Sequence, residues 1–463
     1  MRNVTPPNPG DRESGLRRSL STAQVVMIGL GGAIGTGLFM GSGLAVGYAG
    51  PAVIVSYLLA GFVALVMVFS LSEMAVVHPS AGSFGTYAET YLNPWAGFVV
   101  RYTYWISQVI AIGGESVAAG LYMRYWFVGV PVWIWALGFC LMMLYFNSRS
   151  VGNFGTLESW FALIKVVAIV LFIILGAASI FGVGRPALGL HNLTGLPGGF
   201  MPKGVAGLWM AVSVGIFSFF GIEVIAVTSG ETKNPRAAIP AALRTMVVRL
   251  LLFYVLAVAV IVTTVPWTAT GVSEVRQSPF VTVFQHSGIR DAAGVMNFVV
   301  ISAALSSMNT NVYLCSRMLF SLSRGGYAPR RLGALSGKGS PVAAILVSGV
   351  GVLIAAGVSV FTPDAYGDLL GVALFAAILV WMFILASHLS FRRHHRLEDL
   401  PVRMPFFPWM QWAGLAMLAA ILVTMGLSSS LYVSWMYGVP WLALISVAYF
   451  VWRARSQGAT AQR

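Results

Sequence analysis

Two glycine-interrupted stretches decide the fold of this chain: GGAIGTGLFMGSG over residues 31–43 and FSFFGIE over residues 217–223. Each stretch lies in the middle of a long apolar segment, where a membrane helix would otherwise continue. Glycine lowers helix propensity by about 1 kcal/mol relative to alanine, so a cluster of glycines in one span favours a break in the helix. Close packing against a neighbouring helix, which small residues also permit, is the alternative interpretation of the first stretch.

The composition places the chain in a membrane. Of its 463 residues, 58% are hydrophobic and only 9% are charged, and the mean hydropathy is +0.82. Soluble domains average about 25% charged residues. Because apolar segments of roughly 20 residues recur along almost the whole sequence, we expect an all-α integral membrane protein with about twelve transmembrane helices. The predicted spans are 24–47, 51–77, 97–126, 130–147, 157–182, 205–229, 242–266, 294–323, 341–361, 367–391, 408–428 and 431–454.

The formal net charge of +14 has two interpretations. A strongly basic chain is compatible with nucleic-acid binding. However, lysine and arginine also crowd the cytoplasmic loops of membrane proteins. If the N-terminus is cytoplasmic, most of the 28 Lys and Arg residues fall inside, and the inner loops 230–241, 324–340 and 392–407 are long and basic. We therefore expect a multi-pass protein with both termini in the cytoplasm and no nucleic-acid partner.

Two interrupted helices at corresponding places in two five-helix halves indicate an inverted-repeat transporter whose binding site lies at the breaks. No linker or change in composition divides the chain. We expect a single transmembrane domain over 24–454 between cytoplasmic tails 1–23 and 455–463, with inverted halves at 24–182 and 205–391 and two further helices in 408–454.

Two smaller features concern processing and redox state. Cys140 and Cys315 lie inside apolar spans, where a cysteine behaves as a small buried hydrophobe, so we expect no disulfide. The N-terminal residues contain no apolar core followed by a small-residue cleavage site. No cleaved signal peptide is expected, and the first helix is expected to direct insertion.

Several motifs together resemble the bacterial amino acid permeases of the amino acid–polyamine–organocation superfamily. They are LRRSLSTAQVVMIGLGGAIGTGLFMGSG at 16–43, SEMAVVHPSAGSFGTYAE at 72–89, SWFALIKV at 159–166, FSFFGIEVIAVTSGETKNPRAAIP at 217–240 and SRMLFSLSRGGYAP at 316–329. The resemblance covers nearly the whole chain. It implies the leucine-transporter type of fold, with ten helices in a 5+5 inverted repeat plus two more, and with helices 1 and 6 unwound at the centre. It also implies import of an L-amino acid or a close analogue across the bacterial inner membrane, usually by proton symport with alternating access. An amino acid exchanger of the same fold is the alternative.

The resemblance also implies a set of site residues. It places the carboxylate of a substrate at Thr36 and Gly37, the amino group near the carbonyls around Ile34 and the sixth-helix break, and an aromatic lid at Phe217. Half-helix ends favour this arrangement, since helix N-termini attract anions. Five polar residues are candidates for the pocket lining: Ser107, Gln108, Ser306, Ser307 and Asn309. The alternative is that they join membrane helices structurally, as polar side chains also do. The expected substrate-binding residues are Ile34, Thr36, Gly37, Ser107, Gln108, Glu115, Phe217, Ser218, Phe219, Gly221 and Asn309.

Ionisable residues within the spans are a second group of candidates, because a charge at the bilayer centre costs at least about 2.5 kcal/mol on insertion scales. Lys165 matches the family position where related sodium-driven carriers hold a cation against the first helix, so it is the first candidate for proton coupling. Glu115 and Glu223 are the others, with a purely structural role as the alternative for each. Glu158, near a helix start, is expected to be a solvated or capping acid.

An integral membrane enzyme is the main alternative class. Such enzymes gather His, Asp, Glu or Cys near one membrane face. The six histidines are instead scattered, and the sequence contains neither HExxH nor CxxC. A channel would need neither paired broken helices nor a coupling lysine. We expect a transporter that is not an enzyme, with no cofactor and no metal, whose partners are an amino acid, protons and the lipid bilayer.

Overall fold

The computed structural model describes residues 15–149, 151–183, 186–269, 280–281, 283, 292–361, 365–429 and 431–461. Within these ranges the fold is helical, with no strand and one isolated bridge between Leu20 and Thr232. Eight described helical segments are long and apolar enough to cross a membrane, and Gly204–Phe217 and Leu252–Thr264 are shorter apolar helices. The prediction of an all-helical membrane fold is confirmed. Parts of the two predicted tails, 1–14 and 462–463, lie outside the described residues.

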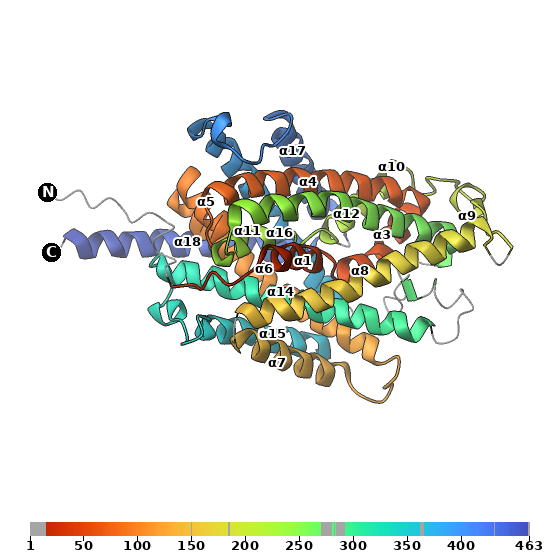
Figure 1. The fold of residues 1–463 in the computed structure, drawn as a ribbon, viewed down its shortest axis with the longest axis horizontal. Helices are drawn as coiled ribbons and strands as arrows, with labels where there is room; N and C mark the ends of the chain where they lie inside the picture. The colour runs from red at the N-terminus through yellow and green to blue at the C-terminus, as the bar shows by residue number, and fades with distance from the viewer. Residues whose placement is uncertain are drawn as a thin grey trace.

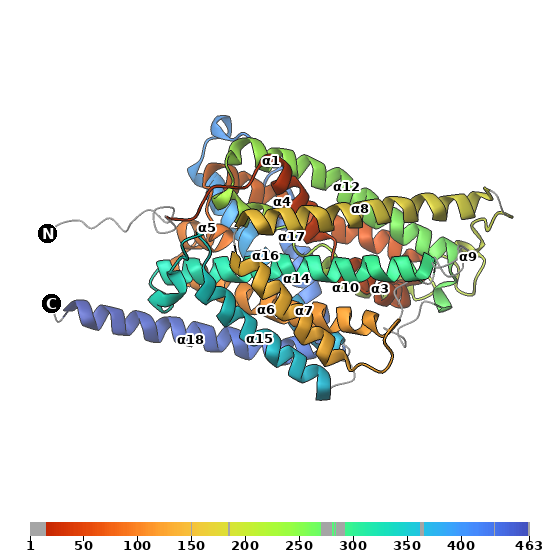
Figure 2. The ribbon, with the colours of Figure 1, turned by 60° about the horizontal axis from the view of Figure 1, so that its bottom comes forward.

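Most helices run roughly along the long axis of the molecule (Figures 1 and 2). The main helices are α1 (Thr22–Ala33), α4 (Val53–Val77), α6 (Pro94–Met123), α7 (Val132–Arg149), α8 (Val151–Phe181), α10 (Gly204–Phe217), α12 (Pro235–Thr264), α14 (Ala292–Arg324), α15 (Val342–Phe361), α16 (Ala365–His394), α17 (Trp409–Leu427) and α18 (Val433–Ala461). The shorter helices used below are α2 (Thr36–Phe39), α3 (Gly41–Ala49), α5 (Ser83–Tyr91), α11 (Val224–Thr228) and the 3-10 helix η3 (Ser229–Glu231).

The two glycine-interrupted stretches are places where the helical backbone stops and restarts. α1 ends at Ala33 and α2 begins at Thr36, so Ile34 and Gly35 lie outside a helix. α10 ends at Phe217, residues 218–223 form turns, and α11 begins at Val224. The predicted span 205–229 is therefore two helices joined by a turn.

α6 and α14 form the centre of the bundle. α6 packs against α14, α16, α7 and α15, and α14 also packs against α8. α8, α17 and α18 lie at the periphery and expose large apolar side chains such as Trp160, Trp412 and Leu444. Because lipid tails are as apolar as these side chains, the outer helices present a surface suited to a bilayer while the polar residues face inward.

Capping residues explain where several helices begin. The side chain of Asn93 accepts a hydrogen bond from the amide of Ala96 at 2.8 Å, and Pro94 occupies the first turn. Both features favour a helix start. α6 therefore begins at Pro94 instead of the predicted 97. Asn234 and Pro235 make the same arrangement for α12, which begins seven residues before the predicted 242 because the helix extends beyond the apolar segment.

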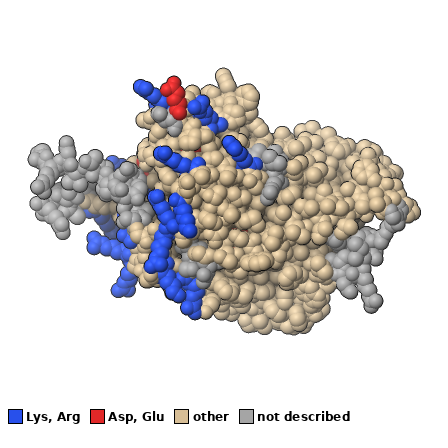
Figure 3. Space-filling view, viewed as in Figure 1, with Lys and Arg blue, Asp and Glu red and all other residues tan. Residues whose placement is uncertain are grey.

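Charge is unevenly distributed over the surface. On the face shown in Figure 3, the described Lys and Arg side chains gather toward one end of the molecule, and the rest of the described surface there is almost free of charge. The end of α18 lies toward the same end, as do the first described residues (Figures 1 and 2). This is the distribution expected when one end of a membrane protein faces the cytoplasm.

A buried ion pair closes the bundle near that end. The guanidinium of Arg317 on α14 donates from Nε to Glu231 Oε1 at 2.8 Å and from Nη2 to Oε2 at 3.3 Å. Both side chains are at most 2% exposed, and the guanidinium also lies 4.0 Å from the ring centroid of Tyr313. The carbonyl of Glu231 accepts from the amide of Leu20 at 3.1 Å. One acidic residue thus links α14, η3 and the segment before α1.

Breaking this pair from one side is expected to destabilise the protein strongly. Arg317→Met leaves a buried carboxylate without its partner, which typically costs about 3 to 5 kcal/mol. The apparent melting temperature of the detergent-purified protein should fall sharply, whereas Arg317→Met combined with Glu231→Gln should recover much of the loss. Arg330→Met, at an exposed position, is the control. A single variant as stable as the control would contradict a structural role for the pair.

Candidate functional site

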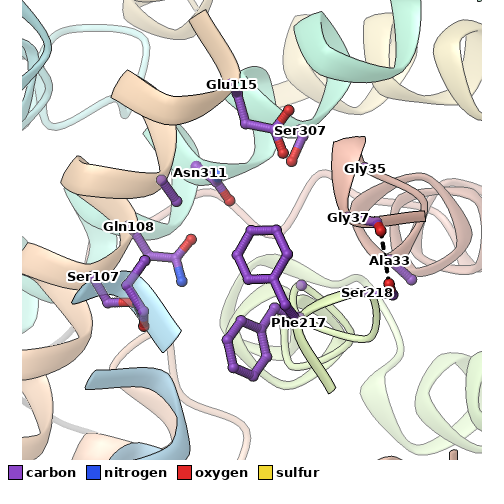
Figure 4. A pocket seen from close by; sticks show the side chains of 14 residues that line it. Ala33, Gly35, Gly37, Ser107, Gln108, Glu115, Phe217, Ser218, Ser307 and Asn311 are labelled. Atoms are coloured by element: carbon purple, nitrogen blue, oxygen red, sulfur yellow. Dashed lines mark hydrogen bonds between the residues drawn. The ribbon is translucent and has the colours of Figure 1, made fainter. Parts of the chain in front are cut away.

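A buried pocket lies where the two interruptions meet. Its described lining comes from α1, α2 and the gap between them, from α6, from α10 and the turn after it, and from α14 and α16. The lining residues are Ala33, Gly35, Gly37, Ser107, Gln108, Ala111, Glu115, Phe217, Ser218, Phe220, Gly221, Ser307, Asn311 and Ala373. In Figure 4, Ala33, Gly35 and Gly37 lie across the pocket from Ser107, Gln108 and Asn311, with Phe217 between the two groups. The pocket therefore joins interrupted backbone to a wall of polar side chains.

The end of α1 leaves carbonyl groups that have lost their helical partners. In a continuous helix the carbonyl of Gly31 would accept from residue 35, but here it accepts from Nζ of Lys165 at 2.5 Å. The carbonyl of Ala33 accepts from the hydroxyl of Tyr254 on α12. Both donors are fully buried. Side chains from α8 and α12 thus satisfy the backbone at the first interruption.

Two glycines allow the two interruptions to touch. A Cβ at Gly37 would lie 2.9 Å from Cδ1 of Phe217 and 2.9 Å from the Cα of Ser218, closer than real Cβ contacts. Gly221 has φ +98°, a conformation that other residues rarely adopt, and a Cβ there would collide with the carbonyl of Gly32. Glycine is needed at both positions because backbone meets backbone.

Hydrogen bonds fasten the second interruption to its surroundings. The hydroxyl of Ser218 donates to the carbonyl of Gly37 at 2.8 Å (Figure 4) and lies 2.9 Å from the hydroxyl of Tyr57. One oxygen of Glu223 accepts from Tyr104 at 2.9 Å, and the other accepts from the amide of Gly221 at 3.1 Å. The carboxyl group of Glu223 therefore bridges the turn to α6.

Glu115 brings a carboxyl group to the first interruption. It is buried, and its carboxyl group interacts with the hydroxyl and amide of Thr36 and with the hydroxyl of Ser307. Its Oε2 atom is buried and accepts no hydrogen bond from any residue in the described ranges. An ionisable group thus lies directly beside the backbone that the sequence predicts to bind a carboxylate.

Glu158 is not the solvated or capping acid expected from the sequence. α8 begins at Val151, two turns earlier, and the side chain of Glu158 is fully buried. It accepts hydrogen bonds from Ser306 and, at 3.0 Å, from Nδ2 of Asn309. Glu158 and Lys165 lie two helical turns apart on one face of α8, and their charges interact. A Cβ at Gly31 would collide with Glu158, so glycine lets α1 approach this face.

The structure brings seven of the predicted substrate-binding residues together. Gly37, Ser107, Gln108, Glu115, Phe217, Ser218 and Gly221 line the pocket. Ile34, Thr36, Phe219 and Asn309 do not belong to its lining. Phe219 stacks on Tyr254 with ring centroids 4.7 Å apart, and Asn309 accepts from Asn147 at 2.8 Å on the side that faces Glu158. Their roles as binding residues remain predictions.

Two further polar residues of α14 line the pocket. Ser307 is one of the candidate lining residues named from the sequence, Ser306 is not part of the lining, and Asn311 is a residue that the sequence analysis does not identify. Ser307 and Asn311 are four residues apart, so they share one face of α14. Asn309 lies between them and faces the opposite way, toward Glu158. Helical periodicity applied to the polar run of α14 would have separated the two groups.

The remaining potentially reactive side chains are the two cysteines and any cluster of residues that could bind a metal ion. Cys140 and Cys315 are buried and unpaired, as expected. Within the described ranges, no group of three or more His, Cys, Asp or Glu side chains is placed to hold a metal ion.

The fold and the pocket define a class: a polytopic membrane protein that encloses a small, polar, charged site between its helices. Comparison with known sequences then identifies the family. The family model for amino acid permeases matches residues 24–458. The chain therefore belongs to the amino acid permease family.

Named relatives have different substrates. The chain is 38% identical over 449 residues to the gamma-aminobutyric acid permease of Bacillus subtilis (strain 168), covering 96% of this chain and 95% of the relative. It is 37% identical over 439 residues to the aromatic amino acid transport protein AroP of Escherichia coli (strain K12), covering 94% and 95%. Both relatives are transporters by name. Because their substrates differ, family membership indicates amino acid transport without fixing the side chain.

Enlarging Gly37 tests the pocket directly. Gly37→Val is expected to weaken amino acid binding by about tenfold to a hundredfold, because overpacking of this kind costs roughly 1 to 3 kcal/mol. Thermal stabilisation of the purified protein by amino acids provides the measurement. Gly41→Ala is the control, since a Cβ at that buried position meets nothing within 4 Å. Equal stabilisation of both variants would mean that the interruption serves packing alone.

Proposed function

We propose that this protein is a secondary active transporter that imports an L-amino acid across the bacterial inner membrane by proton symport with alternating access. Its twelve transmembrane helices form a single domain of the leucine-transporter type, with helices 1 and 6 unwound at the centre. The observation that carries the proposal is the contact between the two interruptions, where Ser218 donates to the carbonyl of Gly37 beside a pocket that contains Glu115.

The interrupted backbone suits the charged ends of an amino acid. An α-amino acid presents a carboxylate, which needs donors, and an ammonium group, which needs acceptors. Amide groups of the segment around Thr36 and Gly37 supply donors, and carbonyl groups near Ile34 and the turn after Phe217 supply acceptors. Because lipid offers neither, a polar ligand is the natural partner for backbone exposed inside a membrane.

Protonation of Glu115 would favour binding of the substrate, which couples the two binding events. Its carboxyl group already interacts with the hydroxyl and amide of Thr36. A substrate carboxylate at Thr36 and Gly37 would bring a second negative charge to the same place, in surroundings where water does not screen it. Protonation of Glu115 removes this repulsion. The protonated transporter therefore binds the substrate more tightly, which is the requirement for symport.

Lys165 couples the proton to the conformation of α1. Its ammonium group donates to the carbonyl of Gly31, and Glu158 and Glu115 offset its charge. Loss of the proton removes that charge and loosens the link between α8 and the end of α1. A proton that binds one arrangement of α1 more tightly than the other shifts their populations.

The distribution of charge supports the orientation. The Lys and Arg side chains on the face in Figure 3 lie toward the end that carries α18's terminus. We assign that end to the cytoplasm, with both chain termini inside.

The coupling ion is tested by uptake into proteoliposomes. Accumulation of the transported amino acid is expected to require an inward proton gradient and to be unaffected by sodium, because Lys165 places a permanent side chain where a sodium-driven carrier would hold its ion. Imposed potassium diffusion potentials control for electrical effects. Accumulation that needs a sodium gradient and persists without a proton gradient would refute the proposal.

Lys165→Ala separates coupling from binding. The variant is expected to lose accumulation against a gradient, because the proton no longer controls the link to Gly31, while retaining exchange of labelled for unlabelled substrate. Counterflow and concentrative uptake are measured in the same vesicles. Lys233→Ala, at an exposed position, is the matched control. Full concentrative uptake by Lys165→Ala would transfer the coupling role to Glu115 or Glu223.

A further inference from the structure

The far wall of the pocket carries two carboxamides that the protein leaves unpaired. Gln108 on α6 is 4% exposed and Asn311 on α14 is 6% exposed. Both side chains line the pocket and point into it (Figure 4). Among the described residues, no hydrogen bond joins either carboxamide to another group. Buried amides are almost always hydrogen-bonded, so two unpaired ones facing one cavity indicate a ligand.

Neighbouring polar groups in the same pocket are already engaged, which distinguishes these two. The hydroxyl of Ser107 donates to the carbonyl of Ala373 at 3.1 Å. Ser218 donates to Gly37, and the hydroxyl of Ser307 interacts with the carboxyl group of Glu115. Apart from Oε2 of Glu115, the unpaired side-chain donors and acceptors of the described lining therefore lie on the wall opposite the interrupted backbone, where the side chain of a bound amino acid would lie.

The charges of the pocket-lining residues restrict which substrate side chains can bind against Gln108 and Asn311. Glu115 is the only ionisable residue among the described residues that line the pocket, and it lies against Thr36 at the interrupted backbone. A cationic or anionic substrate side chain would therefore reach Gln108 and Asn311 without a countercharge. An aliphatic or aromatic side chain would enclose both carboxamides and leave them unpaired, which is costly. Ala111 and Ala373 also line the pocket and add no polar or charged side chain to it.

We propose that Gln108 and Asn311 form the side-chain subsite and select a neutral amino acid with a short hydrogen-bonding side chain, for which a carboxamide is the best complement. An amide offers one donor group and one acceptor, as does each protein carboxamide, so the three pair without a charge. This inference rests on the proposed function for the location of the substrate, but it concerns recognition and makes no use of proton coupling.

Asparagine and leucine are the decisive pair of substrates, because the two side chains have nearly the same shape and differ in hydrogen bonding. Transport of each radiolabelled amino acid is measured in proteoliposomes that contain the full-length protein. The wild type is expected to favour asparagine by more than about tenfold in kcat/KM, since a site built to hydrogen-bond a substrate rejects an analogue that lacks the group. Lysine, glutamate, phenylalanine and γ-aminobutyrate complete the panel.

Substitutions of the two carboxamides test the subsite itself. Gln108→Leu and Asn311→Leu are each expected to lower asparagine transport by about tenfold and to narrow or invert the preference over leucine. Gln108→Glu keeps the shape but adds a negative charge, so it should shift the preference toward lysine. The matched control is Ile110→Leu on the same helix. Ile110 lines an apolar groove between α6, α16 and α18 instead of the pocket.

A binding measurement keeps this inference separate from the proposed function. Thermal stabilisation of the detergent-purified protein by asparagine and by leucine reports recognition without any gradient. Stabilisation by asparagine alone, lost in Gln108→Leu, supports the subsite even if proton-driven uptake fails. Equal stabilisation by both amino acids, a wild-type preference for leucine, or an unchanged preference in both leucine variants would overturn the inference while leaving amino acid transport intact. If no amino acid of the panel stabilises the wild-type protein, both the subsite and the proposed function are overturned.

Discussion

Backbone hydrogen bonding that lipid cannot supply is the constraint on which the rest of the structure depends. Two buried interruptions of the helical backbone free carbonyl and amide groups, and each must find a partner within the protein or on a ligand. Lys165 and Tyr254 occupy carbonyls at the end of α1. Ser218 joins the second interruption to the first, and Glu223 caps the turn beside it. Three buried polar side chains are explained by this need: Lys165 of α8, Tyr254 of α12 and, through Glu223, Tyr104 of α6.

The same constraint explains why buried charge is tolerated here. Lys165 has a carbonyl acceptor and two acids near enough to offset its charge, and Glu158 has two donors from α14. Lys165 and the two acids compensate for the cost of removing one another from water. Removing one of these three groups therefore leaves the others as buried charges without a partner. Under the proposed function, a bound amino acid would add one positive and one negative charge to this balance. It would therefore change the electrostatics of residues that it does not touch.

Much of the fold was predictable because its signals are local. Composition identified the membrane class, and the glycines of residues 31–43 together with Gly221 mark the two places where the described helices end and restart. Helix starts at Pro94 and Pro235 were missed because hydrophobicity marks the membrane interior, whereas caps lie outside it. The position of the candidate pocket was predictable where motifs encode it, as at Gly37 and Glu115, which both line it. Glu158 and Asn311 were missed because their environment depends on how α8 and α14 face each other, which no short pattern encodes.

The segment before α1 is fastened to the body of the protein by its backbone. The amide of Leu20 donates to Glu231, and its carbonyl accepts from Lys233 at 3.0 Å, while its side chain is fully buried. α18, in contrast, extends past the bundle at the same end (Figure 2). For anyone attaching a fluorescent protein or an affinity tag, the two termini are therefore not equivalent. A fusion joined close to Leu20 would pull on the strand-like bridge that holds η3, whereas one joined beyond α18 leaves every contact of the bundle in place.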